Sequence, residues 1–386
     1  MRVDCLSGKF PRIGIVGGGQ LGKMLCLEAK KIGLHVTVLD PTEKCPASSV
    51  SDEQIIADFK DETAIRELAS KSDFITFEIE LANSKVLKEL EEKGCIVNPK
   101  PETLYIIQSK LRQKNFLKEN NLPVPEFVEV KTLQDLKNGL EKFGNHAMLK
   151  LSQDSYDGRG NFELNAETNL EELFKKIEGN EMFLEDWVDF EKELSVMVAR
   201  NDSGEIAAYP VSENIHKESI LDVSIIPARV SEQSKESARQ ISEKVMNCLK
   251  GSGVFGIELF LTRQGKVLIN EIAPRVHNSG HYTIEACKTS QFEQHLRAIL
   301  DLPLGSTELL QNVVMVNILG NEKTGSFRLE GLKEVLKIEG ANLHIYGKHE
   351  SKPKRKMGHV TILDNDLENA LKKAFKVKEV LVMRGE

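Results

Sequence analysis

Two glutamates in the segment GIELFLTRQGKVLINEIA have a spacing that favours a metal–phosphate site. Apolar, β-rich runs flank Gln264-Gly265, and a two-residue hairpin turn there sets Glu258 opposite Glu271. Like charges directly across a strand pair destabilise it, unless a cation lies between them. Oxygen ligands suit Mg²⁺, which usually completes its shell with water and substrate phosphates. A register slip of one residue would instead turn one glutamate to solvent.

The segment APRVHNSGH follows the acidic pair directly. It supplies a guanidinium from Arg275, a carboxamide from Asn278 and imidazoles from His277 and His281. A lone histidine is usually structural. Here a cation, an imidazole and an amide lie beside an expected metal, and this combination suits a small anionic substrate.

Two lysines and a glycine-containing loop could complete a phosphate site. Lys150 ends the apolar strand AMLK, and Lys110 opens the amphipathic helix SKLRQKNF. Either lysine could reach ATP phosphates, although each alone is more often a solvated surface residue. The loop SYDGRGN carries Gly158 and Gly160, and a flexible loop between two strands can close over phosphates and exclude water. The strand end FLEDWV could pack against an adenine ring, although its tryptophan suits a core equally well.

The N-terminal run VGGGQLG spells G-x-G-x-x-G with Gly17, Gly19 and Gly22, and Asp40 ends the next apolar run. That pattern is typical of a dinucleotide fingerprint, but a match alone is weak. Glycines let the backbone approach a ligand, and a helix N-terminus attracts an anion, so any phosphate or ribose would suit. The glycines could also serve only the strand-to-helix turn. Asp40 could hold a ribose hydroxyl or, before a proline, act as a turn residue.

Alternating strand and helix patterns must position these residues. From residue 13 to 107 the chain repeats βα units, which predicts a parallel, doubly wound sheet with Asp61 as a helix N-cap. A segment helical to Asn120 follows, and strands, a polar loop and helices continue beyond it. Three domains are expected, over residues 13–107 (doubly wound), 108–183 (linker helix and lid) and 184–386 (with a small β-rich tail from about 311).

Bulk properties exclude several classes of protein. The chain has 386 residues, 40% of them hydrophobic, and a net charge of −7, which argues against a general nucleic-acid binder because such a protein needs a basic face. No stretch approaches the ~20 apolar residues of a membrane span, and the first 12 residues lack the apolar core of a signal peptide. The six scattered cysteines favour reduced thiols. We therefore expect a cytoplasmic protein that binds neither membrane nor nucleic acid.

Taken together, the motifs resemble the ATP-grasp superfamily. Within it, VGGGQLGKM, TFEIE, SYDGRGN, NEIAPRVHNSGH and RKMGHVT resemble the 5-(carboxyamino)imidazole ribonucleotide synthetases, the ATP- and bicarbonate-dependent carboxylases of purine synthesis. The resemblance runs from residue 13 to about 363. It implies an α/β fold of ATP-grasp architecture, with an N-terminal doubly wound parallel-sheet domain, a small α+β lid and a C-terminal α+β domain. Lys110 stands where many members carry Arg, and Ser155 where Gly is common.

The resemblance also implies a role for individual residues. The expected ATP-binding residues are Lys110, Lys150, Gly158, Arg159, Gly160, Glu185, Asp186, Trp187, Val188, Glu193, His216, Asn270 and Glu271. The expected catalytic residues are Tyr156, Asp157, Arg275, His277 and Asn278, with Asp157 acting on the substrate amine. The expected ribonucleotide-binding residues are Gln20, Leu21, Glu78, Glu80, Lys348 and Arg355, which leaves Asp40 as a turn residue. Glu258 and Glu271 would hold Mg²⁺.

The implied reaction transfers a phosphoryl group from ATP to bicarbonate. Carboxyphosphate then releases carbon dioxide to the exocyclic amine of aminoimidazole ribonucleotide, with Mg²⁺ as the cofactor and a homodimer as the expected assembly. Three alternatives remain open. They are a formate-dependent glycinamide ribonucleotide transformylase, a nicotinamide dehydrogenase and a non-catalytic ATP-binding regulator.

Overall fold

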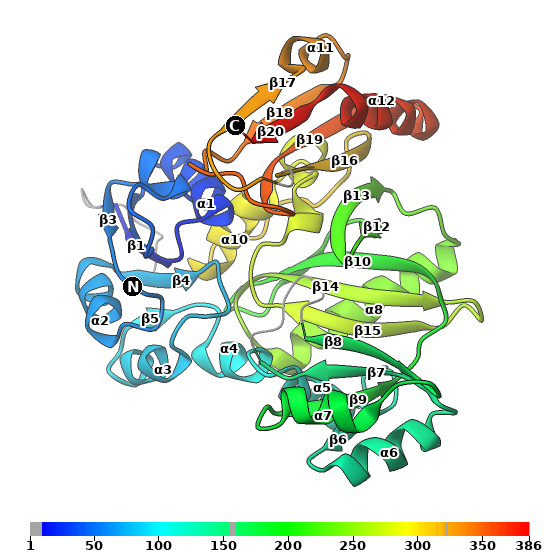
Figure 1. The fold of residues 1–386 in the computed structure, drawn as a ribbon. Coiled ribbons are helices and arrows are strands. Elements are labelled where there is room, and N and C mark those ends of the chain that lie inside the picture. The colour runs from blue at the N-terminus through cyan, green and yellow to red at the C-terminus, as the bar shows by residue number, and fades with distance from the viewer. Residues whose placement is uncertain (1–9, 154–159, 321–322, 386) are drawn as a thin grey trace.

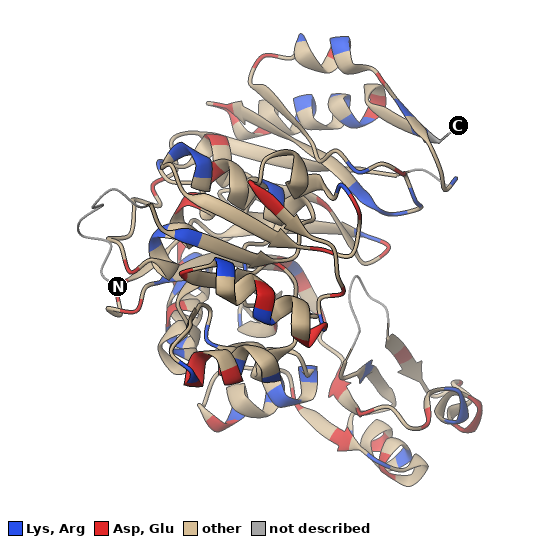
Figure 2. Cartoon of the chain, turned by 90° about the vertical axis from the view of Figure 1, so that its left-hand side faces the viewer, with Lys and Arg blue, Asp and Glu red and all other residues tan. Residues whose placement is uncertain are grey.

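A computed structural model describes residues 10–153, 160–320 and 323–385 (Figure 1). Within these residues the strands form sheets of five, four, nine and two strands. None of the described helices is long and apolar enough to cross a membrane. Acidic and basic residues are interspersed along the helices that face the viewer in Figure 2.

The N-terminal sheet is parallel, with the strand order β3-β2-β1-β4-β5. Its strands are β1 (Arg12–Val16), β2 (His35–Leu39), β3 (Glu53–Ile55), β4 (Phe74–Phe77) and β5 (Ile96–Val97). Its helices are α1 (Gln20–Lys31), α2 (Glu62–Lys71), α3 (Ser84–Glu92) and α4 (Pro101–Ile107), with a 3₁₀ turn η1 (Pro46–Ser49). The strand order reverses at β1, so the carboxyl ends of β1 and β4 flank the crevice where such folds bind ligands. The predicted cap of α2 is confirmed, because the Asp61 carboxylate accepts from Ala64 N at 2.9 Å.

The segment expected to be helical as far as Asn120 is two helices. After α4 the chain breaks at Gln108, and α5 (Lys110–Glu119) begins anew. Ser109 caps α5, because its Oγ accepts from Arg112 N at 3.1 Å. The new start makes Lys110 the first residue of α5.

A four-stranded antiparallel sheet follows, in the order β6-β9-β7-β8. Its strands are β6 (Phe127–Val130), β7 (His146–Leu151), β8 (Asn161–Asn165) and β9 (Met182–Asp186), and its helices are α6 (Leu133–Lys142) and α7 (Leu170–Ile177). Glu185 of β9 pairs with Met148 of β7, two residues before Lys150. Because strand side chains alternate with a period of two, Glu185 and Lys150 share one face.

The nine-stranded sheet has the order β15-β14-β10-β12-β13-β16-β19-β18, and β11 pairs with β10. Its strands are β10 (Phe190–Arg200), β11 (Ile206–Ala208), β12 (Ser212–Lys217), β13 (Ile220–Ile226), β14 (Gly253–Thr262), β15 (Val267–Ala273), β16 (Asn312–Leu319), β18 (Ala341–Ile345) and β19 (Lys356–Asp364). Three strands from beyond residue 311 therefore extend the sheet that carries Glu258 and Glu271.

Helices and a small ribbon complete this part of the chain. They are α8 (Glu232–Leu249), η2 (Asn278–Gly280), α9 (Thr283–Ala286), α10 (Gln291–Ile299), α11 (Leu332–Leu336), α12 (Leu367–Val380), and the strands β17 (Phe327–Glu330) and β20 (Val382–Gly385). One apolar cluster joins Ile13 and Leu25 of the N-terminal domain to Phe292 of α10 and Met315 of β16. This shared core fixes the N-terminal crevice against the nine-stranded sheet.

Candidate active site

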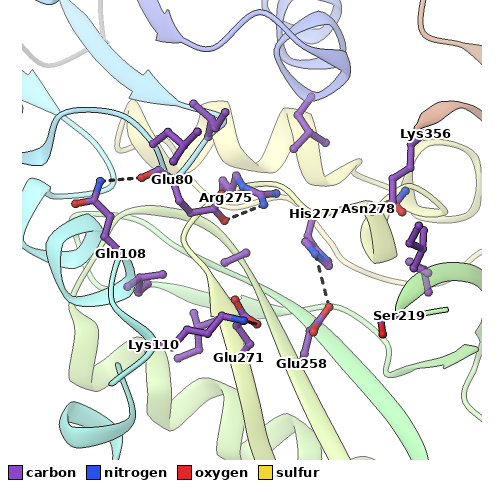
Figure 3. Close-up of a pocket in the computed structure, with 18 of the residues that line it drawn as sticks. Glu80, Gln108, Lys110, Ser219, Glu258, Glu271, Arg275, His277, Asn278 and Lys356 are labelled. Atoms are coloured by element: carbon purple, nitrogen blue, oxygen red, sulfur yellow. Dashed lines mark hydrogen bonds and ion pairs between the residues drawn. The ribbon is translucent and has the colours of Figure 1, made fainter. Parts of the chain in front are cut away.

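One cavity of about 1860 Å³ is lined by residues from the four-stranded and nine-stranded sheets and from the loops that follow β1, β2 and β4 of the N-terminal sheet (Figure 3). Its lining includes these predicted residues: Gln20, Leu21, Glu78, Glu80, Lys110, Lys150, Glu185, Asp186, Trp187, Val188, Glu193, His216, Glu258, Asn270, Glu271, Arg275, His277, Asn278, Lys348 and Arg355. Gly160, just before β8, is not among the described lining residues. Tyr156, Asp157, Gly158 and Arg159 lie outside the described residues, as does Ser155.

The carboxylate pair lies on adjacent strands, as predicted: Glu258 of β14 is directly opposite Glu271 of β15. The predicted two-residue turn is wrong, because Thr262 N donates to Lys266 O at 2.9 Å and three residues lie between them. Gly265 takes the positive φ of +76° that closes such a loop. The register then shifts by one at Asn270, which restores the pairing of the two glutamates. A bulge of this kind re-aims a side chain, and Asn270 points its Oδ1 to Lys150 Nζ at 3.3 Å.

The surroundings of the pair favour a cation. Desolvation, and then the charge of Glu271, raise the pKa of Glu258 to about 7. Lys110 Nζ lies 3.1 Å from Glu271, and His277 Nε2 lies 3.7 Å from Glu258 (Figure 3). Burial, and then Arg275, hold the pKa of His277 well below its usual range, so this imidazole is neutral. The carboxylate repulsion is therefore only partly relieved by the chain itself.

No cluster of three or more His, Cys, Asp or Glu ligands is found among the described residues. Two carboxylates nevertheless fit Mg²⁺, because this ion commonly takes one or two protein carboxylates and fills its shell with water and phosphate oxygens. Glu258 and Glu271 are the residues that would hold it.

Arg275 and Asn278 are held by neighbouring groups on the cavity wall. Arg275 forms an ion pair with Glu80 at 2.8 Å, and the backbone carbonyl of Glu80 accepts from Gln108 Nε2 at 2.7 Å (Figure 3). Asn278 exchanges hydrogen bonds with Asn317 of β16, at 2.6 and 3.0 Å. These contacts fix a guanidinium and an amide beside the carboxylate pair.

The sequence prediction missed a buried lysine beside the two lysines that were expected to bind phosphate. Lys114 of α5 is 2% exposed and forms an ion pair with Glu185. Lys150 forms an ion pair with the other oxygen of that carboxylate. Lys114 follows Lys110 by four residues on a helix with apolar neighbours, and that spacing was the available signal. Burial acts to raise the pKa of Glu185, but the two lysines outweigh it and lower that pKa.

The expected ribose end of the site contains Glu193 and His216. His216 Nδ1 lies 2.7 Å from Glu193 Oε2. Burial acts to lower the pKa of His216, but the contact with Glu193 outweighs it and raises that pKa. Trp187, which follows β9, stacks on His146 with ring centroids 4.1 Å apart. The aromatic face at this end of the cavity is thus held by β7.

The glycine loop at the end of β1 folds around two acidic side chains. Gly19 N donates to Glu78 Oε1 at 2.6 Å, and Gly18 N donates to Asp40 Oδ2 at 2.9 Å. Gly17 has a φ of +107°, and a Cβ there would lie 2.6 Å from Glu78 Cγ. Asp40 makes a turn contact, because its Oδ1 accepts from Thr42 N at 2.8 Å, and it also lines the cavity. Desolvation raises the pKa of Glu78 to about 7.

The basic loop before β19 also lines the cavity. Lys348 Nζ donates to Lys356 O at 2.7 Å, and Arg355 donates to Glu350 O at 3.0 Å. The N-terminal domain holds this loop through Lys23 Nζ, which donates to Tyr346 O at 3.2 Å. The cavity lining therefore combines cations of this loop with residues of the N-terminal domain.

Sequence comparisons place this geometry in a family. Residues 10–108 match the ribonucleotide synthetase preATP-grasp domain, residues 115–292 the ATP-grasp domain, and residues 313–373 the phosphoribosylaminoimidazole carboxylase C-terminal domain. The chain is 43% identical over 351 residues to the N5-carboxyaminoimidazole ribonucleotide synthase of Bacillus subtilis (strain 168), with 91% of each chain covered. The chain belongs to the N5-carboxyaminoimidazole ribonucleotide synthetase family.

Solved structures of N5-carboxyaminoimidazole ribonucleotide synthetases confirm the predicted ATP-grasp fold. The Thermotoga maritima structure is similar with a TM-score of 0.90 and 51% identity, covering 98% of this chain and 100% of that one. The Aspergillus clavatus structure, in complex with ADP and 5-aminoimidazole ribonucleotide, has a TM-score of 0.89 and 34% identity, covering 96% and 98%. The chain is thus an ATP-grasp ligase, as predicted, and not a nicotinamide dehydrogenase.

Proposed function

We propose that this chain carboxylates the exocyclic amine of 5-aminoimidazole ribonucleotide, using ATP and bicarbonate. The observation that carries the proposal is the shape of the cavity. It joins a carboxylate pair suited to Mg²⁺ and the two lysines expected to bind phosphate to a glycine loop and a basic loop. One compartment can therefore hold a nucleoside triphosphate and a ribonucleotide together.

The phosphoryl step relies on positioning and on neutralised charge. When bound, Mg²⁺ would draw charge from the phosphates at Glu258 and Glu271. Lys110 and Lys150 are the proposed partners of the phosphate oxygens. Arg275, which Glu80 orients, neutral His277 and Asn278 are the proposed partners of the bicarbonate that receives the phosphoryl group. Water must be excluded, because free carboxyphosphate would hydrolyse.

The ribonucleotide is assigned to the opposite half of the cavity. Gln20 and Leu21 present the free N–H groups of the first turn of α1, which attract an anion or a polar ring. Lys348 and Arg355 are the proposed partners of its 5′-phosphate. Asp157 is the proposed group that acts on the amine, and this assignment stays a prediction because residues 154–159 lie outside those described.

Release of ADP is the test of the reaction. We expect ADP only when ATP, bicarbonate and aminoimidazole ribonucleotide are all present, and much less with formate and glycinamide ribonucleotide. The reverse preference would favour the transformylase. ATP binding without turnover under either condition would favour a regulator.

The cellular setting and the assembly are also proposals. We propose a cytoplasmic enzyme, because the five cysteines in the described residues are all free thiols. We propose a homodimer from the family resemblance, and sedimentation equilibrium of the purified chain tests it. A monomer at all concentrations would contradict the dimer.

A further inference from the structure

Lys114 is a charged side chain buried outside the predicted site. Its ammonium forms an ion pair with Glu185 Oε1 and also donates to the backbone carbonyl of Ile269 at 3.2 Å. It is 2% exposed and does not line the cavity. Lys114 therefore acts on a ligand only through another residue.

That other residue is Lys150, on the far side of the same carboxylate. Lys150 Nζ contacts Glu185 Oε2, and it also reaches the bulged Asn270 Oδ1 at 3.3 Å. Unlike Lys114, Lys150 lines the cavity. A single buried carboxylate thus has two ammonium partners, and only one of them can reach a ligand.

The charges do not balance within this group. Two ammonium groups face one carboxylate, and buried charges are stable only when they are paired. Burial lowers the pKa of Lys114 to about 8, while the pKa of Glu185 is also lowered, so the buried pair is charged at neutral pH. The surplus positive charge lies on the cavity side, where a phosphate would neutralise it.

We propose that Lys114 is a positioning residue that keeps Glu185 paired, so that Lys150 is free to turn to the phosphates of a bound nucleotide. The inference rests on the proposed function in taking that nucleotide to be ATP or ADP. Without the charge of Lys114, Lys150 is the only ion-pair partner that Glu185 keeps among the described residues. A phosphate must then compete with a buried carboxylate for the same ammonium.

A purely structural role for Lys114 makes a different prediction. The ammonium links α5 to β9 and β15, so its loss could loosen the whole nucleotide pocket. A looser pocket would weaken the binding of adenosine and of ADP alike. If instead Lys150 is no longer free, only the binding of the ligand that carries phosphate is weakened.

Trp187 supplies the measurement, because it is the only tryptophan of the chain and it lines the cavity. Its fluorescence is titrated with ADP and with adenosine in the full-length protein. We expect Lys114→Met to weaken ADP binding at least about tenfold and adenosine binding less than about twofold. Lys114→Arg, which keeps the charge, should restore ADP binding to within about threefold of the unmodified chain. Lys118→Met, an exposed lysine one turn further along α5, is the control and should change neither ligand.

Where Lys114→Met does not fold, Lys114→Gln carries the same expectation, because its amide can still donate to Glu185 without a charge. Equal weakening of both ligands, or unchanged ADP binding, in a folded uncharged variant would overturn the inference and leave the proposed function standing. An unmodified chain that binds adenosine no worse than ADP, with or without Mg²⁺, would overturn the phosphate site and the inference with it.

Discussion

Two carboxylates that line the cavity have similarly raised pKa values and differ in the second contribution to them. The pKa values of Glu258 and of Glu78 are both raised to about 7, and desolvation is the largest cause for each. At Glu258 the second cause is another carboxylate, Glu271. At Glu78 the second effect is a backbone hydrogen bond from Gly19, which acts to lower the pKa.

This difference in surroundings distinguishes the two carboxylates. Glu258 needs a cation to relieve a repulsion, whereas Glu78 already accepts a hydrogen bond from the chain. Glu258 faces a like charge, so a cation relieves the repulsion. Glu78 holds the glycine loop, and the Gly18 and Gly19 N–H groups that would bind a dinucleotide pyrophosphate already donate to carboxylates. The fingerprint motif here builds a wall of the cavity rather than a pyrophosphate site.

The prediction with the largest expected effect removes one charge from the Glu258–Glu271 pair. Glu271→Gln should lower kcat for Mg-ATP turnover by at least ~10³-fold, because the proposed Mg²⁺ site would lose one of its two carboxylates. ADP release in the presence of all substrates is the measurement. Glu236→Gln, an exposed change on α8, is the matched control. Near-normal turnover in Glu271→Gln would contradict the assignment of Glu271 as a Mg²⁺ ligand.

The second test concerns the stability that Glu78 contributes. Its pKa is raised from 4.5 to about 7 by folding, so its stabilising contribution is full below about pH 4.5 and is lost as the pH rises through 7. The loss is bounded by about 3 kcal/mol. Urea unfolding of Glu78→Gln should therefore show a flatter dependence on pH than the unmodified chain between about pH 5 and pH 9. Saturating Mg²⁺ should leave that difference unchanged. A Mg²⁺-dependent difference would contradict the view that Glu78, unlike Glu258, needs no cation.

The third test asks whether the basic loop and the wall with the Glu258–Glu271 pair bind different substrates. Arg355→Ala should raise the KM for aminoimidazole ribonucleotide roughly tenfold or more, because a charge-assisted contact to phosphate is lost. The KM for ATP should stay nearly unchanged. Initial rates with each substrate varied in turn make the measurement. An equal rise in both constants would show that this loop is not a separate phosphate site.

The prediction with the smallest expected effect distinguishes the cost of backbone strain from the cost of a steric contact with Glu78. Gly17 and Gly94 both have positive φ, +107° and +93°, but a Cβ at Gly94 meets nothing within 4 Å. Gly94→Ala should cost about 1 kcal/mol of unfolding free energy through strain alone. Gly17→Ala should cost about 1–2 kcal/mol more, because Glu78 must move. Thermal unfolding of the two variants measures both losses of unfolding free energy. Equal losses would mean that the Glu78 side chain moves aside without a measurable cost.

Local patterns predicted much of the fold, because strand and helix periods follow from burial. The opposed glutamates were also predicted, although through a two-residue turn that the structure replaces with a longer loop and a bulge. The shift at Asn270 places the buried Ile269 and Ile272 three residues apart instead of two, and this break in the alternation was the available signal for the bulge. The burial of Lys114 depends on β9 and β15, which are distant in sequence, so spacing within α5 could only hint at it.

The nine-stranded sheet cannot be completed during synthesis until its last strands have been made. β14 and β15 lie at one edge, while β16 and β19, which carry the sheet beyond β13, end at residues 319 and 364. At ~5–20 residues per second, on the order of ten seconds separates synthesis of the glutamate hairpin from synthesis of β19. Until β16 is made, β13 presents an unpaired edge, and from then until β19 is made β16 presents one. Such an edge is the kind of surface that nascent chains need chaperones to shield.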